Sequence, residues 1–195
     1  QYPYGCTEQT VSAAFPQLYF GDMSDLMQLK KDVKINANTN IIEAIRKIKM
    51  RQLYNGALTL WDGEGKEDWW ATIYAAHFLL EARKAGFEVD NSLLETMLTY
   101  INNRLKNKET ITYYYNRDKN KKIAPKEVTY GLYVLALAGR SNVPAMNYYK
   151  ANPSLLALDS RYLLSAAYAA AGDKKSFTGL LPAAFSGEES VTQTG

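Results

Sequence analysis

The only cysteine of the chain, Cys6, stands three positions before a glutamine, Gln9. Within one helical turn, residues at this spacing are neighbours, with Cβ atoms roughly 5–6 Å apart. At that distance the Cys6 thiol can attack the side-chain amide carbon of Gln9 and expel ammonia. The product is an internal thioester, an acylating group stored inside the protein. The pair therefore predicts covalent capture of an external nucleophile, with Cys6 supplying the sulfur and Gln9 the acyl carbon.

The residues around this pair favour the same chemistry over the simpler alternative, an unlinked cysteine buried as a small apolar side chain. Gly5 permits an unusual backbone conformation directly before the cysteine, where a Cβ would crowd the ring. Glu8 brings a negative charge to the start of the helix that follows, where such a charge is stabilising. Tyr2 and Tyr4 are positioned to shield an electrophile from water.

The string Tyr2-Pro3-Tyr4-Gly5-Cys6-Thr7-Glu8-Gln9 resembles the thioester motif of the alpha-2-macroglobulin and complement family. Its Thr7 and its leading Tyr-Pro-Tyr are most similar to the bacterial alpha-2-macroglobulins. Blocks at 56–61, 69–75 and 127–133 also resemble that family. The resemblance implies an all-α fold, an α/α toroid of helix pairs, and a thioester domain that is a fragment of a larger multidomain protein.

The resemblance also implies a function, which is that of an endopeptidase inhibitor and not of an enzyme. The thioester of such a domain acylates lysine amines of a target protease, which is then captured covalently in a single-use reaction. The other partners implied are the remaining domains of the parent chain. Neither a cofactor nor a metal is implied, and the implied location is the bacterial cell envelope, in the periplasm.

The nucleophile that such a domain prefers depends on a histidine. In complement proteins that favour hydroxyls, a downstream histidine attacks the thioester first. The stretch before Glu127 contains no histidine, and Asn116 is our candidate for the position that the histidine takes elsewhere. The single histidine, His77, lies outside that block, and we interpret it as structural. The resemblance therefore implies direct attack by amines.

Most of the chain shows helical periodicity. Apolar residues predict helices over 41–53, 73–82 and 162–171; a capping box at 92–95 predicts another, and one more follows Pro125. Three helices end at an Ala-Gly dipeptide, as expected for a left-handed cap; the glycines are Gly86, Gly139 and Gly172. Only 109–116 has extended character, and we predict a hairpin there. We expect one domain over 1–195, truncated before the last helices of the toroid.

Composition sets further limits. The chain has 195 residues, of which 47% are apolar, enough for a sizeable core in one or two domains. A net charge of +3 does not support nucleic-acid binding, and no run of 18 apolar residues predicts direct membrane insertion. We interpret a local excess of basic residues as a solvated loop. These residues are Arg117, Lys119, Lys121, Lys122 and Lys126.

Two other functions stay open at the sequence level. The acids Asp62, Glu64 and Asp68 suggest a carbohydrate-active α/α-toroid enzyme or a Ca²⁺ loop, although their spacing favours a turn between helices. A non-covalent helical binding module, with Cys6 and Gln9 unlinked, is the other alternative. The tryptophans of the same region are candidates for a dry cover over the thioester or for plain core. They are Trp61, Trp69 and Trp70.

Overall fold

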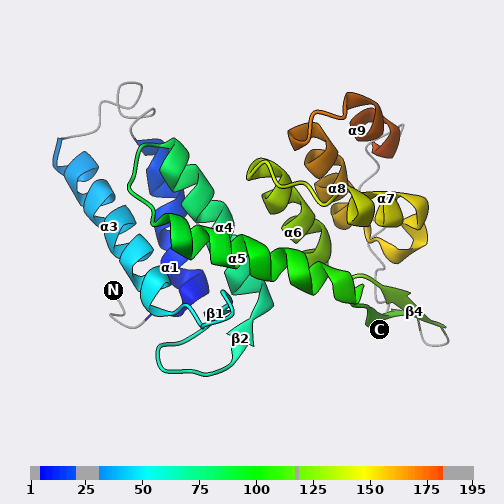
Figure 1. Ribbon diagram of the computed structural model, residues 1–195, viewed down its shortest axis with the longest axis horizontal. Helices are drawn as coiled ribbons and strands as arrows, with labels where there is room; N and C mark the ends of the chain where they lie inside the picture. Colours follow the sequence, from blue (N-terminus) through cyan, green and yellow to red (C-terminus); the bar gives the residue numbers. More distant parts are fainter. Residues whose placement is uncertain (1–4, 21–30, 117–118, 182–195) are drawn as a thin grey trace, which may run out of the picture. The chain divides into compact units, whose positions relative to one another are not determined.

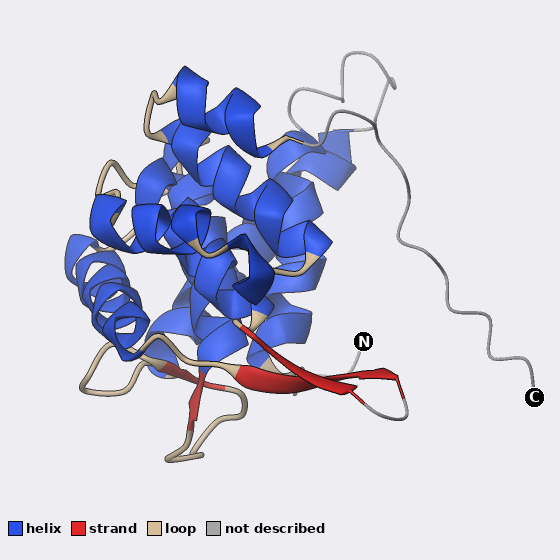
Figure 2. Ribbon diagram, turned by 90° about the vertical axis from the view of Figure 1, so that its right-hand side faces the viewer, coloured by secondary structure: helices blue, strands red, loops and turns tan. Residues whose placement is uncertain are grey.

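The structure is a computed structural model that describes residues 5–20, 31–116 and 119–181. The chain divides into two compact units, Gln1–Arg104 and Leu105–Gly195. Helix predominates in both units, and the strands in the described residues form two short antiparallel hairpins (Figure 2). The predicted all-α class is therefore confirmed, whereas a single domain over 1–195 remains a prediction.

The first unit is built from four α-helices, one 3-10 helix and one small hairpin among its described residues. In chain order they are α1 (Thr7–Ala14), η1 (Phe15–Tyr19), α3 (Lys31–Met50), β1 (Leu58–Thr59), β2 (Glu67–Asp68), α4 (Trp69–Lys84) and α5 (Asn91–Arg104). Figure 1 shows α1 between α3 and α4, and it packs against both. Helix α4 also packs against α5. The largest fully buried side chains of this unit include Ile41, Ile48, Phe78, Leu79 and Met97.

Helix α4 has a clear start and stop in the sequence. The Asp68 side chain accepts a hydrogen bond from the backbone N–H of Ala71 at 2.7 Å and so caps the first turn. After the helix, Gly86 adopts φ +91°, and the N–H groups of Gly86 and Phe87 donate back to carbonyls of the last turn. This is the left-handed cap that the Ala-Gly dipeptide predicts, and Gly139 and Gly172 also have positive φ.

A second glycine position is set by close packing. Gly56 lies in the connection between α3 and β1, with φ +91°. A Cβ placed on Gly56 would meet the carbonyl oxygen of Thr96, in α5, at 2.2 Å. The neighbouring Gln52 side chain donates to the carbonyl of Leu93 at 2.9 Å, which ties the same connection to α5. Glycine is therefore required where this connection meets the helix.

The second unit contains four α-helices, two 3-10 helices and one hairpin among its described residues. They are η2 (Leu105–Asn107), β3 (Ile111–Asn116), β4 (Lys119–Ile123), α6 (Lys126–Leu137), α7 (Val143–Ala151), η3 (Pro153–Leu155), α8 (Leu158–Ala170) and α9 (Lys174–Leu180). Helix α8 packs against α6, α7 and α9. The core of this second unit includes Leu132, Leu135, Met146, Tyr149, Leu164 and Tyr168. The hairpin predicted at 109–116 is confirmed, with β4 as its second strand.

Three predicted details are wrong. Helix α5 begins at Asn91, because Asp90 accepts the Ser92 N–H at 2.8 Å and takes the cap that we assigned to Ser92. Helix α8 begins at Leu158, earlier than the apolar pattern suggested, since polar residues fill its first turn. Of the basic residues assigned to a loop, Lys119, Lys121 and Lys122 lie in strand β4 and Lys126 begins α6, whereas Arg117 lies outside the described residues. The backbone of β4 pairs with the Tyr-rich strand β3, while Lys121 and Lys122 remain exposed to solvent.

Candidate functional site

Cys6 is the residue that caps helix α1. Its sulfur accepts a hydrogen bond from the backbone N–H of Gln9 at 3.4 Å. In return, the Gln9 side-chain oxygen Oε1 accepts a hydrogen bond from the backbone N–H of Cys6 at 3.1 Å. These two bonds form a capping box in which a cysteine takes the place usually held by serine or threonine. The sulfur and the amide of Gln9 thus lie on the same turn, as the spacing predicts.

The two partners differ in their access to solvent. Cys6 is 7% exposed, whereas Gln9 is exposed. A buried sulfur on an exposed glutamine partner suits a group that is attacked from outside at the Gln9 side chain. The sequence spacing does not predict this difference in solvent exposure, because it places both residues on the same helical turn.

The first turn of α1 is held by the hairpin that precedes α4. The backbone N–H of Thr7 donates to the carbonyl of Leu60 at 2.9 Å, and its hydroxyl donates to the carbonyl of Thr59 at 2.7 Å. Glu8 accepts a hydrogen bond from the indole N–H of Trp70, in α4, at 3.2 Å. The motif is therefore fixed by contacts with two elements that are distant in sequence.

Arg51 is a functional candidate that sequence reasoning missed. It follows the last residue of α3, and its side chain is only 3% exposed. Its guanidinium Nη2 donates to the carbonyl of Gly5 at 2.8 Å, and Nη1 lies 3.4 Å from the hydroxyls of both Thr7 and Thr10. Its Nε donates to Asp62 at 2.5 Å. One buried cation thus binds three residues of the motif region.

The three acids proposed for sugar chemistry have structural partners. The hydrogen bond from Arg51 holds the pKa of Asp62 below its usual value, which makes this carboxyl a poor proton donor. Asp68 caps α4, and Glu64 accepts from the backbone N–H of Trp61 at 3.3 Å. The segment is the turn of the β1–β2 hairpin, as its spacing favours. Among the described residues, no group of three or more His, Cys, Asp or Glu side chains forms a metal site.

His77 lies at the far end of α1 from Cys6. Its ring contacts that of Phe15 edge to face, with centroids 5.1 Å apart. Phe15 is nine positions after Cys6, about 13 Å along a helical path at the usual rise per residue. Burial lowers the pKa of His77. These contacts agree with a structural role. Asn116 ends β3, and its side chain lies outside the described part of the chain.

The remaining predicted site residues are Tyr2, Tyr4 and Gly5. Tyr2 and Tyr4 lie outside the described residues. Gly5 does not adopt a positive φ, and a Cβ there would lie 3.4 Å from Gln9 Oε1, an ordinary contact. Gly5 thus has no left-handed backbone, and the expectation that a Cβ at this position would crowd the thioester ring stays a prediction.

The three tryptophans have different environments. Trp69 is 8% exposed and packs against Tyr100 and under the guanidinium of Arg104. It belongs to the core, and not to a cover over Cys6. Trp61 is 46% exposed, and Trp70 contacts the motif through Glu8. Trp70 is thus the tryptophan that we associate with the thioester motif.

A groove of about 470 Å³ runs beside Gln9, between α1 and α3. Small residues on α1 and α3 leave it open, and Glu43 and Lys47 of α3 contribute charged groups to its lining. The full lining is Gly5, Gln9, Thr10, Ala13, Ala14, Gln17, Asn40, Glu43, Ala44 and Lys47. An external side chain that reaches Gln9 can be accommodated along this groove.

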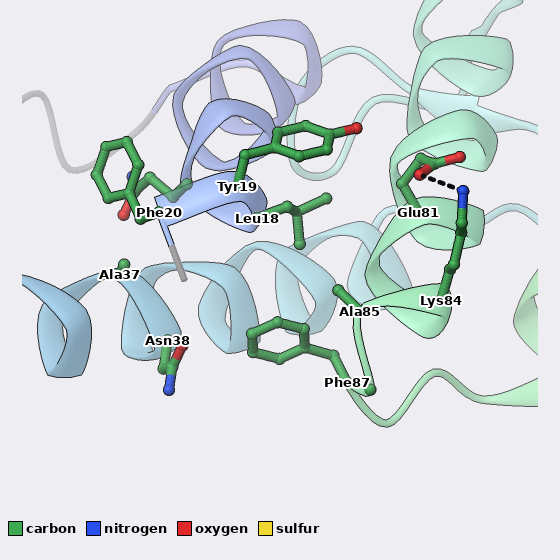
Figure 3. Close-up of a pocket in the computed structure, with 11 residues that line it drawn as sticks. Leu18, Tyr19, Phe20, Ala37, Asn38, Glu81, Lys84, Ala85 and Phe87 are labelled. Carbon is green, nitrogen blue, oxygen red and sulfur yellow. Dashed lines mark ion pairs between the residues drawn. The ribbon is translucent and has the colours of Figure 1, made fainter. Parts of the chain in front are cut away.

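Another pocket, of about 610 Å³, lies at the η1 end of the unit. Figure 3 shows Leu18 and Tyr19 from η1, Asn38 from α3 and Phe87 after α4 around it, with an ion pair between Glu81 and Lys84 at 3.8 Å. Neither Cys6 nor Gln9 lines this pocket. It is therefore separate from the candidate site.

Within the described ranges, no helix is both long and apolar enough to cross a bilayer.

Comparisons with known proteins give one consistent answer. The family model described as A-macroglobulin TED domain matches residues 1–135. An alpha-2-macroglobulin of Escherichia coli is 33% identical over 105 residues, which cover 51% of this chain and 6% of the relative. One from Xylella fastidiosa is 27% identical over 192 residues, covering 97% of this chain and 12% of the relative. The chain thus spans a small part of these curated relatives.

Solved structures show the same fold. Native Escherichia coli alpha-2-macroglobulin, from domain MG7 to the C-terminus, aligns with a TM-score of 0.74 at 23% identity, over 92% of this chain and 28% of that one. Salmonella alpha-2-macroglobulin reacted with methylamine aligns with the same score at 24% identity, over 92% of this chain and 12% of that one. At these identities the likeness establishes architecture only.

Proposed function

Because this chain belongs to the A-macroglobulin TED domain family, we propose that it is the thioester domain of a bacterial alpha-2-macroglobulin-like protease inhibitor. The observation that carries the proposal is the reciprocal pair of hydrogen bonds between Cys6 and Gln9. They place the sulfur beside the side-chain amide that it would attack. The family and this contact support a thioester between the two residues.

Two steps make up the proposed chemistry. In the first, Cys6 Sγ bonds to the Gln9 side-chain carbon, the C–N bond breaks, and the amide nitrogen leaves as ammonia. In the second, an external amine bonds to the same carbon, the C–S bond breaks, and the amine proton ends on sulfur. The product is a stable amide at Gln9 and a free thiol at Cys6.

The geometry favours attack by an amine from outside the domain. Gln9 is exposed and borders the groove between α1 and α3, which has room for the aliphatic stem of a lysine. His77 lies at the other end of α1, so the described residues offer no imidazole to relay the acyl group. Asn116 stays our candidate for the position that a histidine takes in relatives that acylate hydroxyls.

The partner that we propose is a protease, captured once and not turned over. Solved Escherichia coli relatives were activated by trypsin and by porcine elastase, which supports this class of target. The chain would act within a longer protein, whose other domains cover the thioester until cleavage. We place that protein in the bacterial cell envelope, in the periplasm, on the basis of its family. No contact among the described residues favours sugar chemistry.

The test is intact mass and amine uptake in the full-length protein. A closed thioester lowers the mass by that of one ammonia molecule, masks the Cys6 thiol, and allows methylamine to attach at Gln9. Cys6→Ser is the matched control, because its hydroxyl keeps the helix cap while removing the sulfur. Gln9→Asn keeps an amide but shortens its reach by one methylene.

Both variants are expected to have full sequence mass and to take up no methylamine. A wild-type protein of full sequence mass, with a Cys6 thiol that titrates before any treatment, would overturn the proposal. That outcome would favour a non-covalent helical binding module.

A further inference from the structure

The environment of Arg51 has a consequence for the chemistry at Gln9. Its guanidinium binds the carbonyl oxygen of Gly5 at 2.8 Å. That carbonyl belongs to the same peptide group as the Cys6 N–H, which donates to Gln9 Oε1 at 3.1 Å. An unbroken path of contacts therefore runs from Asp62 through Arg51 and one peptide group to the oxygen of the proposed acyl group.

From this path we infer that Arg51 is a positioning residue for acyl transfer at Gln9. When an amine adds to the Gln9 carbon, negative charge develops on Oε1. The Cys6 N–H is then the donor that stabilises this oxyanion. Arg51 fixes the plane of the Gly5–Cys6 peptide, and its positive charge at the carbonyl end polarises the N–H at the other end.

Burial makes this contact strong. The Arg51 side chain is 3% exposed, so water competes little for its donors. Its other contacts leave it little freedom to turn away. The hydroxyls of Thr7 and Thr10 lie 3.4 Å from Nη1, and Asp62 holds Nε. A planar guanidinium can reach these separate acceptors at once, which an ammonium cannot.

Arg46 offers a contrast on the same helix. It binds Glu43 through Nε at 2.8 Å and Nη2 at 2.6 Å, but its side chain is 56% exposed. Its hydrogen bonds within the described residues go to Glu43 and Met50, and not to α1. An Arg46→Gln variant therefore removes one cation from α3 without removing a hydrogen bond of the path to Gln9. It serves as the matched control, because Arg46 acts on Asp62 only through its charge, whereas Arg51 binds Asp62 directly.

The inference rests on the proposed thioester, and the experiment separates the two. Full-length wild type, Arg51→Gln, Arg51→Lys, Asp62→Asn and Arg46→Gln are first assayed for thioester content by intact mass. The rate constant for methylamine uptake is then measured per closed thioester. The infrared carbonyl band of the thioester gives a second readout, because stronger polarisation of the C=O bond lowers its frequency.

We expect Arg51→Gln to slow uptake about tenfold and to raise the band frequency. This is less than the roughly 10²–10³-fold loss for an oxyanion donor removed outright, since Arg51 acts through the peptide. The uptake rate of Arg51→Lys is expected to lie between those of wild type and Arg51→Gln. Asp62→Asn is expected to slow uptake about two- to threefold, because the guanidinium of Arg51 keeps its charge but loses one hydrogen-bond acceptor. Arg46→Gln should match wild type.

A wild type without a thioester refutes the proposed function itself. With a thioester present, an Arg51→Gln protein with wild-type rate and band position refutes the inference alone. If Arg51→Gln does not fold, Asp62→Asn decides, because Asp62 is 63% exposed and Arg51 keeps its contacts with Gly5, Thr7 and Thr10 in that variant. An unchanged rate and band in that variant would overturn the role of Arg51.

Discussion

At the scale of single residues, Cys6 has two roles that the structure joins. Its sulfur is the proposed leaving group, and it also accepts the Gln9 N–H as the cap of α1. A thiol is a weaker acceptor than a hydroxyl or carboxylate. A cysteine at this position is therefore better explained by its chemistry than by helix stability.

This view predicts the stability of two variants at Cys6. Cys6→Ser is expected to be more stable than Cys6→Ala by about 1 kcal/mol, because serine restores a good cap and alanine has none. Urea denaturation of both proteins measures the difference, and neither can form a thioester. Equal stabilities would show that the cap contact contributes nothing.

His77 predicts a dependence of stability on pH. Burial lowers its pKa in the folded chain, whereas the unfolded chain titrates near 6.5. Below that pH the unfolded state binds a proton that the folded state excludes, so the free energy of unfolding falls as pH falls. Above it both states are neutral, and this contribution is constant.

The measurement is urea denaturation of wild type and His77→Gln at about pH 7.5 and about pH 5.5. Wild type is expected to lose more stability than the variant between these two conditions. A variant that shows the same loss as wild type would exclude His77 as the cause.

At the scale of elements, the sequence predicts what local chemistry determines. The helix ends at Gly86, Gly139 and Gly172 follow from one dipeptide, and Cys6 and Gln9 meet because they share a turn. The Lys-rich strand β4 depends on a partner strand, and Arg51 binds Gly5 across 46 positions. No local pattern distinguishes this arginine from the solvated Lys and Arg residues before it.

Two glycines of the α3–α4 connection allow a controlled test of close packing. Both Gly56 and Gly63 have positive φ, so an alanine at either is strained by about 1–2 kcal/mol. A Cβ added at Gly56 would also meet the backbone oxygen of Thr96 at 2.2 Å. A Cβ added at Gly63 would have no neighbouring atom within 4 Å.

Gly56→Ala is therefore expected to destabilise the chain clearly more than Gly63→Ala, with the excess about 2 kcal/mol or above. Thermal and urea denaturation of the two variants give this difference. Equal losses would mean that the connection and α5 can separate at little cost.

At the scale of the whole molecule, the exposure of Gln9 sets a limit on the domain acting by itself. An acyl carbon beside an open groove is accessible to water as well as to amines. The curated relatives are much longer than this chain, which covers 6% and 12% of two of them. We therefore assign the protection of the thioester to other parts of a longer protein.

This assignment predicts different behaviour for the chain alone and for the full-length protein. Produced alone, the chain is expected to show a titratable Cys6 thiol and to take up little methylamine, because water has already opened the bond. The full-length protein is expected to keep the thiol masked. Thiol titration and intact mass of the two proteins measure this, and a masked thiol in both would refute external protection.

The capping box at the start of α1 also bears on the direction of the reaction. Joining sulfur to the Gln9 carbon removes the amide and leaves a thioester sulfur that is a poorer acceptor for the Gln9 N–H. Aminolysis frees the sulfur to accept the Gln9 N–H again, whereas Oε1 is present in both forms and can keep its bond from the Cys6 N–H. A restored cap is worth about 1 kcal/mol. The regained cap on α1 therefore adds a small free-energy preference for the domain after aminolysis over the domain that holds the proposed thioester.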